Sequence, residues 1–385
     1  MSRLEKFVLV FLVLVAAALW AAVGWSAYQD AWKAPLGPGL FLPNRAPTQR
    51  SAAASFLTQP ALEFNLTPGK ATRTPYKGKT ALCGGPQTMT ILAIGSDTRA
   101  KGYLYGLADV TRLVRVDFVT PRVSVLEFPR DIWVEIPGIS DHYKITHGKI
   151  NQAYLYGNPG MGYYDGPGQG PGLLARTLEL NFGAHPDHYL AANMQTFVRL
   201  IDVIGGVDVT LPYSVDARKS DQKERNDLYF SPGAHHLNGT QALMLARIRE
   251  HGTFGRADQQ NRVLCAARDA LLSPANLPKL PEIIETFKGS VQTDLSPEQI
   301  SQLACLVPQL KPGSISFITF PRELLTEART YDIGVKKNVY IFKADFNTLR
   351  VYVSAFEQGV WPESTPPVAP EGTPRPPGEG GFNCP

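Results

Sequence analysis

The sequence is poor in the residues that hold zinc or act as covalent nucleophiles. Its four cysteines and seven histidines in 385 residues include no C-x-x-C spacing and no paired histidines, which argues against a zinc site. No Ser-His-Asp order and no internal repeat is visible. The net charge of +4 is mild, whereas dedicated nucleic-acid-binding domains carry a concentrated basic face. What remains is a chain with 44% apolar residues, enough for a packed core.

A long apolar run stands near the N-terminus. Residues 7–25, FVLVFLVLVAAALWAAVGW, are nineteen residues without a charge, a length that suits one membrane-spanning helix. Arg3 and Lys6 precede it and would keep the N-terminus in the cytoplasm and the rest outside. A cleaved signal peptide is the alternative, since residues 22–24 form a passable cleavage site. The length of the run favours the anchor, and both interpretations carry the remaining chain across the membrane.

The four cysteines fit such export, because an even number of cysteines in an oxidising compartment indicates disulfides. Four cysteines allow three pairings. Cys265 and Cys305 lie in two apolar helical stretches, and Cys83 and Cys384 lie at the two edges of the folded part. We therefore predict the pairs Cys265–Cys305 and Cys83–Cys384. Four buried thiols are the alternative.

Composition and periodicity divide the chain into five parts and predict a mixed α/β fold with a central sheet flanked by helices. The parts are a cytoplasmic stub and anchor at 1–28, a linker at 29–88, the main domain at 89–275, a C-terminal extension packed on it at 276–358, and a Pro/Gly-rich tail at 359–385. Predicted strands include 89–94, 110–119, 122–128, 132–136, 187–192, 314–320 and 349–353, and predicted helices include 172–182, 195–204, 241–247, 259–272 and one that starts at 297.

Charged side chains interrupt the apolar runs at the ends of predicted elements, where α/β sheets place ligands. Mg²⁺ takes few carboxylates and completes its shell with water and phosphate oxygens, and arginine binds phosphate through a planar fork. A site with both suits a pyrophosphate or phosphodiester. Taken singly, an aspartate after a strand is usually a turn residue or a helix cap. The charged residues are Asp97, Arg99, Asp109, Arg130, Asp131, Arg247, Arg249 and Arg256.

The order of motifs resembles the LytR-CpsA-Psr family of bacterial cell-envelope glycopolymer transferases. Each motif alone is weak, but ten of them in order make a specific pattern between Thr90 and about Leu264. They are G-S-D-T-R, A-D-V, F-P-R-D, I-P-G, K-I-N-Q-A-Y, P-D-H-Y, I-D-V-I-G-G-V-D-V, L-N-G-T-Q-A-L, R-I-R and F-G-R.

The resemblance implies a phosphotransferase on the extracytoplasmic face of the cell membrane. Such an enzyme joins a glycan from a polyprenyl-pyrophosphate carrier to peptidoglycan or a related wall glycan through a phosphodiester, with pyrophosphate cleavage by water as a side reaction. It needs Mg²⁺, or Mn²⁺ in its place, and an apolar tunnel for the lipid. Our tunnel candidates are Phe197, Leu200, Ile201, Leu243 and Leu245, for which an ordinary core role is the alternative.

The resemblance also assigns roles to residues of this chain. Asp97 and Asp109 hold the metal ion, and the proton acceptor is Asp97 or Asp131. The catalytic set is Asp97, Asp109, Arg130, Arg247 and Arg249, and the substrate-binding set is Arg99, Arg130, Asp131, Arg247, Arg249, Arg256 and Arg262. For Arg99, pairing with an acidic side chain is an equal alternative. The two arginines of R-I-R, two residues apart, serve one site only if their helix ends near them.

One departure stands out. The family's R-Q-Q triplet appears as Q-Q-N at 259–261, and Arg262 lies about one helical turn away as a substitute. The loss of one arginine supports an alternative function of another class, a non-catalytic protein that binds polyprenyl lipids or wall glycans. A secreted phosphodiesterase or nuclease is a third hypothesis, which the modest net charge disfavours.

Overall fold

The structure is a computed structural model, and it describes residues 24–40, 42, 80–98, 106–218, 225–248, 252–276, 282, 291–311, 313–361 and 382–384. Apart from residues 24 and 25, the predicted membrane span lies outside these ranges, as do Arg99 and Arg249. Residues 24–33 are helical. No helix within the described ranges has both the length and the apolar character needed to cross a membrane.

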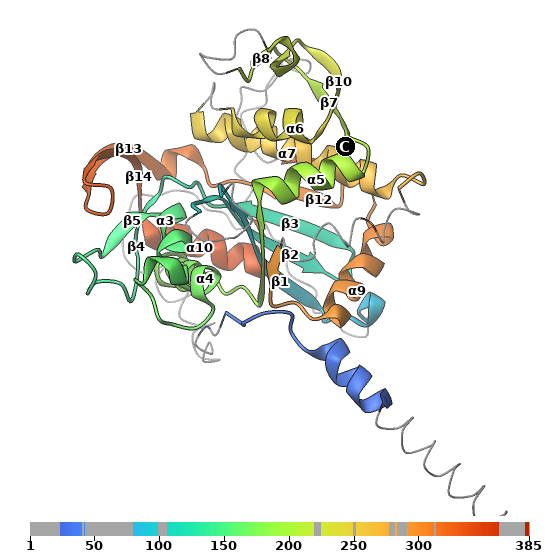
Figure 1. Ribbon diagram of the computed structural model, residues 1–385, viewed down its shortest axis with the longest axis horizontal. Helices are drawn as coiled ribbons and strands as arrows, with labels where there is room; N and C mark the ends of the chain where they lie inside the picture. The colour runs from blue at the N-terminus through green and yellow to red at the C-terminus, as the bar shows by residue number, and fades with distance from the viewer. Residues whose placement is uncertain are drawn as a thin grey trace, which may run out of the picture.

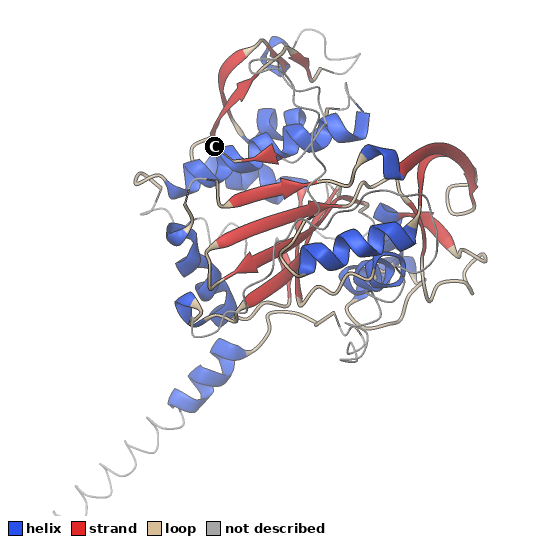
Figure 2. Ribbon diagram, turned by 180° about the vertical axis from the view of Figure 1, so that it is seen from behind, coloured by secondary structure: helices blue, strands red, loops and turns tan. Residues whose placement is uncertain are grey.

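A seven-stranded mixed sheet runs through the centre of the protein, with helices on both of its sides (Figures 1 and 2). It confirms the predicted mixed α/β fold. Two neighbouring pairs, β1–β6 and β3–β12, are parallel, and the other four are antiparallel. In spatial order the strands are β11 (Val291–Thr293), β6 (His188–Asn193), β1 (Thr88–Ser96), β2 (Ala108–Asp117), β3 (Arg122–Glu127), β12 (Ile315–Ile318) and β15 (Phe382–Asn383).

Strand β1 is central because both of its faces are apolar. Met89 and Ile91 pack into one cluster with Phe118, whereas Leu92 and Ile94 point to the opposite face and join the main core. Alternate residues of a strand face opposite sides of the sheet, so a continuous apolar run gives a strand that is buried on both faces.

Three helices cover the main-core face: α3 (Ile150–Tyr156), α4 (Gln169–Phe182) and α10 (Phe346–Glu357). As predicted, α4 ends at Gly183, whose φ of 68° suits glycine. The predicted strand at 349–353 is wrong, because it lies within α10. There Leu349, Val353 and Phe356 bury one helical face, so the apolar spacing is that of a helix.

A smaller core lies beside the sheet and is built by the segments drawn at the top of Figure 1. Ile201 and Leu245 are fully buried in it, and Phe197 and Leu200 pack against it, so these tunnel candidates form part of a helix–sheet core. Its elements are α5 (Met194–Val203), β7 (Val207–Leu211), β8 (Val215–Asp216), β9 (Tyr229–Phe230), β10 (Gly233–Leu237), α6 (Gly239–Arg247) and α7 (Gly252–Leu272).

Two further ribbons and one helix complete the described fold. Helix α9 (Pro297–Leu306) starts as predicted, with Ser296 as N-cap and Gln299 closing a capping box. The antiparallel ribbons are β4 (Trp133–Glu135) with β5 (His147–Lys149), and β13 (Leu325–Asp332) with β14 (Lys337–Ala344). Single 3₁₀ turns are η2 (Leu82–Gly84), η3 (Pro159–Met161), η4 (Asn226–Leu228), η6 (Val307–Gln309) and η7 (Arg322–Leu324).

All four cysteines form disulfides, but the predicted pairing is wrong. The pairs are Cys83–Cys305 and Cys265–Cys384, with Cα–Cα distances of 5.8 and 5.4 Å, within the range that a disulfide requires. Helix α9 packs on η2, which brings Cys305 to Cys83. The end of the predicted tail returns as β15 beside β12, so Cys384 shares a small cluster with Cys265 of α7. Helix packing, and not position along the chain, selects the partners.

Candidate functional site

Asp97 and Asp109 meet at one end of the β1–β2 pair. The pairing runs Gly95 with Val110 and Ser96 with Ala108, with a register shift between them. Asp109 is therefore the extra residue of a β-bulge, a device that re-aims a side chain and is common next to active sites. Asp97 follows the last residue of β1, and its backbone N–H donates to the Leu107 carbonyl at 2.9 Å. The two aspartates assigned to one metal ion thus lie at the same end of this strand pair.

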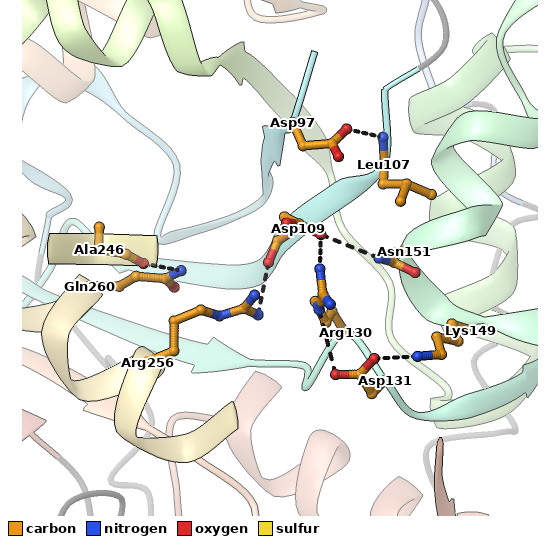
Figure 3. A network of polar contacts seen from close by, with 10 residues as sticks. All are labelled: Asp97, Leu107, Asp109, Arg130, Asp131, Lys149, Asn151, Ala246, Arg256 and Gln260. Carbon is orange, nitrogen blue, oxygen red and sulfur yellow. Dashed lines mark hydrogen bonds and ion pairs between the residues drawn. The ribbon is translucent and has the colours of Figure 1, made fainter. Parts of the chain in front are cut away.

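The Asp109 carboxylate is the centre of a polar network, which Figure 3 shows from close by. The Arg130 guanidinium donates to its Oδ1 at 2.5 Å, and the Asn151 amide donates to the same oxygen at 3.3 Å. From α7, Arg256 donates to the Asp109 backbone carbonyl at 3.3 Å. Two of the predicted arginines thus contact Asp109, one from the loop after β3 and one from α7.

Asp97 is partly buried. Its Oδ1 accepts the Leu107 N–H at 2.6 Å. Burial raises the pKa of Asp97 above its ordinary value of 3.8; the Leu107 hydrogen bond opposes this shift, Asp109 adds to it, and Arg130 and Arg247 oppose it. The charge of Arg247 therefore acts on Asp97. Helix α6 ends at Arg247, which meets the condition set for the R-I-R pair.

We predict that Asp97→Asn stabilises the protein at neutral pH when no divalent cation is present. Because the folded state holds this proton more tightly than the unfolded chain, the free energy of unfolding falls as pH rises through and above 3.8. The neutral amide avoids that loss. Thermal unfolding is expected to show a higher melting temperature than wild type at about pH 7 and none of this gain at about pH 3. An unchanged melting temperature at pH 7 would contradict the prediction.

Asp131 is the centre of a second group of ion pairs, next to the network around Asp109. Lys149 donates to its Oδ1 at 2.6 Å, and Arg130 donates to its Oδ2 at 3.4 Å. Lys149 ends β5 and Asn151 lies in the first turn of α3, so the strand-to-helix junction delivers both. Both residues belong to the K-I-N-Q-A-Y motif, but neither was assigned a role from the sequence. The feature that could have indicated one is the pair of polar side chains, a lysine and an asparagine, two residues apart in that motif.

The two aspartates suit a divalent cation that also binds phosphate. No described residue donates a hydrogen bond to Oδ2 of either Asp97 or Asp109, so each has a carboxylate oxygen available. The described residues form no cluster of three or more His, Cys, Asp or Glu side chains suited to a metal ion. Mg²⁺ is commonly held by one or two carboxylates plus substrate phosphates and water, so this residue set fits it.

Helix α7 places the altered triplet away from the carboxylates. Gln259 donates to the Tyr213 hydroxyl at 3.1 Å and Arg262 donates to the Thr210 carbonyl at 3.4 Å. Neither contacts Asp97 or Asp109. Arg262 is therefore not a substitute at the two aspartates, and Gln259 lies against Tyr213.

Gln260 and Asn261 instead hold a buried arginine that sequence reasoning missed. Arg112 of β2 donates to Asn261 Oδ1 at 2.7 Å and to Gln260 Oε1 at 3.1 Å, and its guanidinium lies 3.4 Å from Glu127. Burial lowers the pKa of Arg112, and Glu127 opposes that shift. The four side chains tie α7 to the sheet near Arg256.

A pocket of about 480 Å³ lies elsewhere and is lined by polar residues, including His188, Asp294 and Gln299. Gln299 contacts His188 at 2.8 Å. None of the residues lining the pocket belongs to the aspartate–arginine network or to the tunnel candidates.

Residues 69–350 match the model of the LytR_cpsA_psr family. The chain belongs to the LytR_cpsA_psr family. The match extends past the motifs into α10, so β11 to β14 lie within it. Two curated relatives are the polyisoprenyl-teichoic acid–peptidoglycan teichoic acid transferases TagV of Bacillus subtilis and TagU of Oceanobacillus iheyensis. TagV is 33% identical over 210 residues, 54% of this chain and 49% of TagV. TagU is 32% identical over 231 residues, 59% of this chain and 63% of TagU.

This member thus spans about half of TagV and under two thirds of TagU. The crystal structure of B. subtilis TagV superposes with a TM-score of 0.54 at 25% identity, covering 71% of this chain and 98% of that one. The LytR_cpsA_psr fold is therefore shared across most of the solved TagV chain.

Proposed function

We propose that this family member is a membrane-anchored phosphotransferase that acts outside the cytoplasm. It moves a glycopolymer from a polyprenyl-pyrophosphate carrier to peptidoglycan or a related wall glycan. The observation that carries the proposal is the Asp97–Asp109 pair with Arg130 and Arg256 around it. TagV and TagU are named as polyisoprenyl-teichoic acid–peptidoglycan teichoic acid transferases, which supports the same chemistry. The apolar run at 7–25 and the two disulfides support the proposed location.

The residues of the site suit displacement at phosphorus. Arg130, Arg247 and Arg256 bind and orient the pyrophosphate. Their positive charges stabilise the negative charge that develops on its oxygens in the transition state. A bound Mg²⁺ or Mn²⁺, held by Asp97 and Asp109, would supply further positive charge at those oxygens. The acceptor hydroxyl oxygen forms a bond to the sugar-proximal phosphorus while the bond to the lipid phosphate breaks. Water in place of the acceptor gives pyrophosphate cleavage as the side reaction.

The hydroxyl proton needs an acceptor, and Asp97 suits that task better than Asp131. Lys149 and Arg130 donate to the two oxygens of Asp131, so both oxygens already accept hydrogen bonds from cations. Burial raises the pKa of Asp97, and a raised pKa brings a carboxylate closer to the operating pH of a general base.

Removal of divalent cations tests the cofactor assignment. We expect EDTA to abolish transfer from a polyprenyl-pyrophosphate donor by the purified full-length protein, and Mg²⁺ or Mn²⁺ to restore it. The assay measures phosphodiester-linked product on peptidoglycan and, without acceptor, release of lipid phosphate. Full activity in EDTA would contradict the assigned role of Asp97 and Asp109.

The alternative, a non-catalytic protein that binds lipid or glycan, was supported by the altered triplet. Gln259 contacts Tyr213, but Arg130 and Arg256 both contact Asp109, and these retained arginines favour the catalytic function. If the purified protein retained bound polyprenyl lipid but showed neither transfer nor cleavage, the non-catalytic alternative would be favoured.

A further inference from the structure

A cluster of aromatic rings lies at the end of α3 that points away from the aspartates, and the reaction outlined above gives these rings no task. We propose that this aromatic platform, defined as His142, Tyr143, Tyr156 and Tyr163, binds the sugar rings of the acceptor glycan. The inference rests on the proposed function, because it names a binding subsite for that reaction. The platform brings together the loop between β4 and β5, the last residue of α3 and the glycine-rich loop at 157–168.

Tyr163 is the centre of the platform. Its ring stacks on His142 with centroids 5.0 Å apart and planes inclined by 15°. Tyr143 stands edge-on to it at 6.2 Å, and Tyr156 packs against it at 5.5 Å. The hydroxyl of Tyr156 in turn abuts Gly334 in the turn between β13 and β14. Buried Tyr156 thus supports the partly exposed ring of Tyr163, on which the other two rings pack.

Tyr143 is presented to solvent in a way that folding alone does not explain. Its side chain is 70% exposed, more than any other large apolar or aromatic side chain among the described residues. Tyr143 and Lys144 both adopt positive φ, at 52° and 57°, a conformation that L-residues with side chains rarely adopt. Strained backbone of this kind tends to persist where it serves a function. Here it places an aromatic ring on the surface beside a stacked pair.

The ligand chemistry follows from the rings. An aromatic face carries partial negative charge and a large apolar area, which complements the C–H faces of pyranose rings. The platform has no matched array of charges, since Asp141 and Lys144 flank Tyr143 with opposite signs. The platform therefore suits the sugar faces of a glycan better than a polymer recognised through a dense row of phosphates.

The platform is connected to the reaction centre by short, rigid elements. The loop that carries Tyr143 runs into β5, which ends at Lys149, the partner of Asp131. Helix α3 then runs from Ile150 to Tyr156. At 1.5 Å per residue, the path from Lys149 to Tyr156 spans about 10 Å, a distance that a short oligosaccharide bridges. Buried Gln152 braces this helix by donating to Asp332 at 2.8 Å.

The side on which the platform lies identifies the acceptor as its ligand. Arg256 approaches Asp109 from α7, which belongs to the smaller core where the apolar helices stand. Asn151 of α3 donates to Asp109, and Lys149 at the end of β5 donates to the neighbouring Asp131; both come from the side of the main-core face. Displacement at phosphorus places the entering and leaving oxygens roughly in line. If the lipid phosphate leaves towards the apolar helices, the acceptor hydroxyl enters from the α3 side, where the platform stands.

Tyr143→Gly is a sharp test because glycine suits the positive φ at this position. The variant removes the ring and relaxes the backbone, so its melting temperature is expected to equal or exceed that of wild type. Binding of peptide-free glycan strands from peptidoglycan to the full-length protein in detergent is expected to weaken about three- to tenfold. The KM for these strands as acceptor rises by the same factor, with kcat and cleavage of the donor by water unchanged.

Two matched variants complete the experiment. Tyr143→Phe keeps the ring and is expected to bind glycan like wild type. Tyr229→Ala removes a tyrosine that is 46% exposed on β9, in the smaller core, and is also expected to bind like wild type. Equal binding by wild type and Tyr143→Gly overturns the inference, as does a weakened affinity for the lipid-linked donor in place of the acceptor. If wild type neither transfers nor cleaves the donor, the proposed function fails, and a Tyr143-dependent loss of glycan binding still supports the platform.

Discussion

Replacing Asp109 by asparagine is expected to lower the rate of glycopolymer transfer by about a thousandfold. The amide keeps the size of the side chain but loses the negative charge that pairs with Arg130 at 2.5 Å and that we assign to the metal ion. A thousandfold loss corresponds to about 4 kcal/mol of transition-state stabilisation. Single-turnover transfer and lipid-phosphate release, measured on the same preparation, check the result.

The control for this variant is Asp208→Asn. Asp208 also pairs with a basic side chain, His236 at 2.8 Å, but its side chain is 88% exposed on β7, so transfer should remain at the wild-type rate. A wild-type rate in Asp109→Asn would refute the assigned site. Arg130→Ala should fall into the same class as Asp109→Asn, and a double variant should lose little more than either single one, because the two residues act as a unit.

Removing the Cys265–Cys384 disulfide is expected to lower the free energy of unfolding by about 4–5 kcal/mol. The two cysteines are 119 residues apart, so the bond removes much conformational freedom from the unfolded chain. The bond also fastens α7, which carries Arg256, to the edge strand β15. The variant Cys265→Ala/Cys384→Ala should therefore lose transfer rate as well as stability. Denaturant unfolding and the transfer assay at a temperature where the variant is folded measure both.

The second disulfide supplies the comparison. Cys83–Cys305 closes a longer loop of 222 residues, and each doubling of loop length adds only about 0.6 kcal/mol. Cys83→Ala/Cys305→Ala is thus expected to be destabilised to a similar extent. It joins η2 to α9, which carry none of the site residues, so its transfer rate should stay within about threefold of wild type. Equal losses of rate in both double variants would show that α7 is not specially positioned by its disulfide.

Local structure followed from short-range patterns. The helices predicted to end at 182 and to start at 297 do so, with Gly183 and Ser296 as caps, because a cap depends on residues within three or four positions. The apolar runs around β1 and β2 predicted two strands. The segment at 349–353 was misassigned because a short run of β-branched and aromatic residues suits a strand and a helix alike, and burial of Leu349 and Val353 on one face of α10 decides the matter.

The sequence by itself determined the chemical kind of the site: two aspartates at the ends of neighbouring strands, and arginines at the ends of later elements. Only the tertiary structure decided which groups touch. A bulge aims Asp109, a strand-to-helix junction brings in Lys149 and Asn151, and the rotation of α7 directs Arg256 to the site and Gln259 to Tyr213. Composition and local spacing are properties of neighbours along the chain. Contacts between residues more than a hundred positions apart, such as Cys265 and Cys384, depend on which face each helix buries against the sheet.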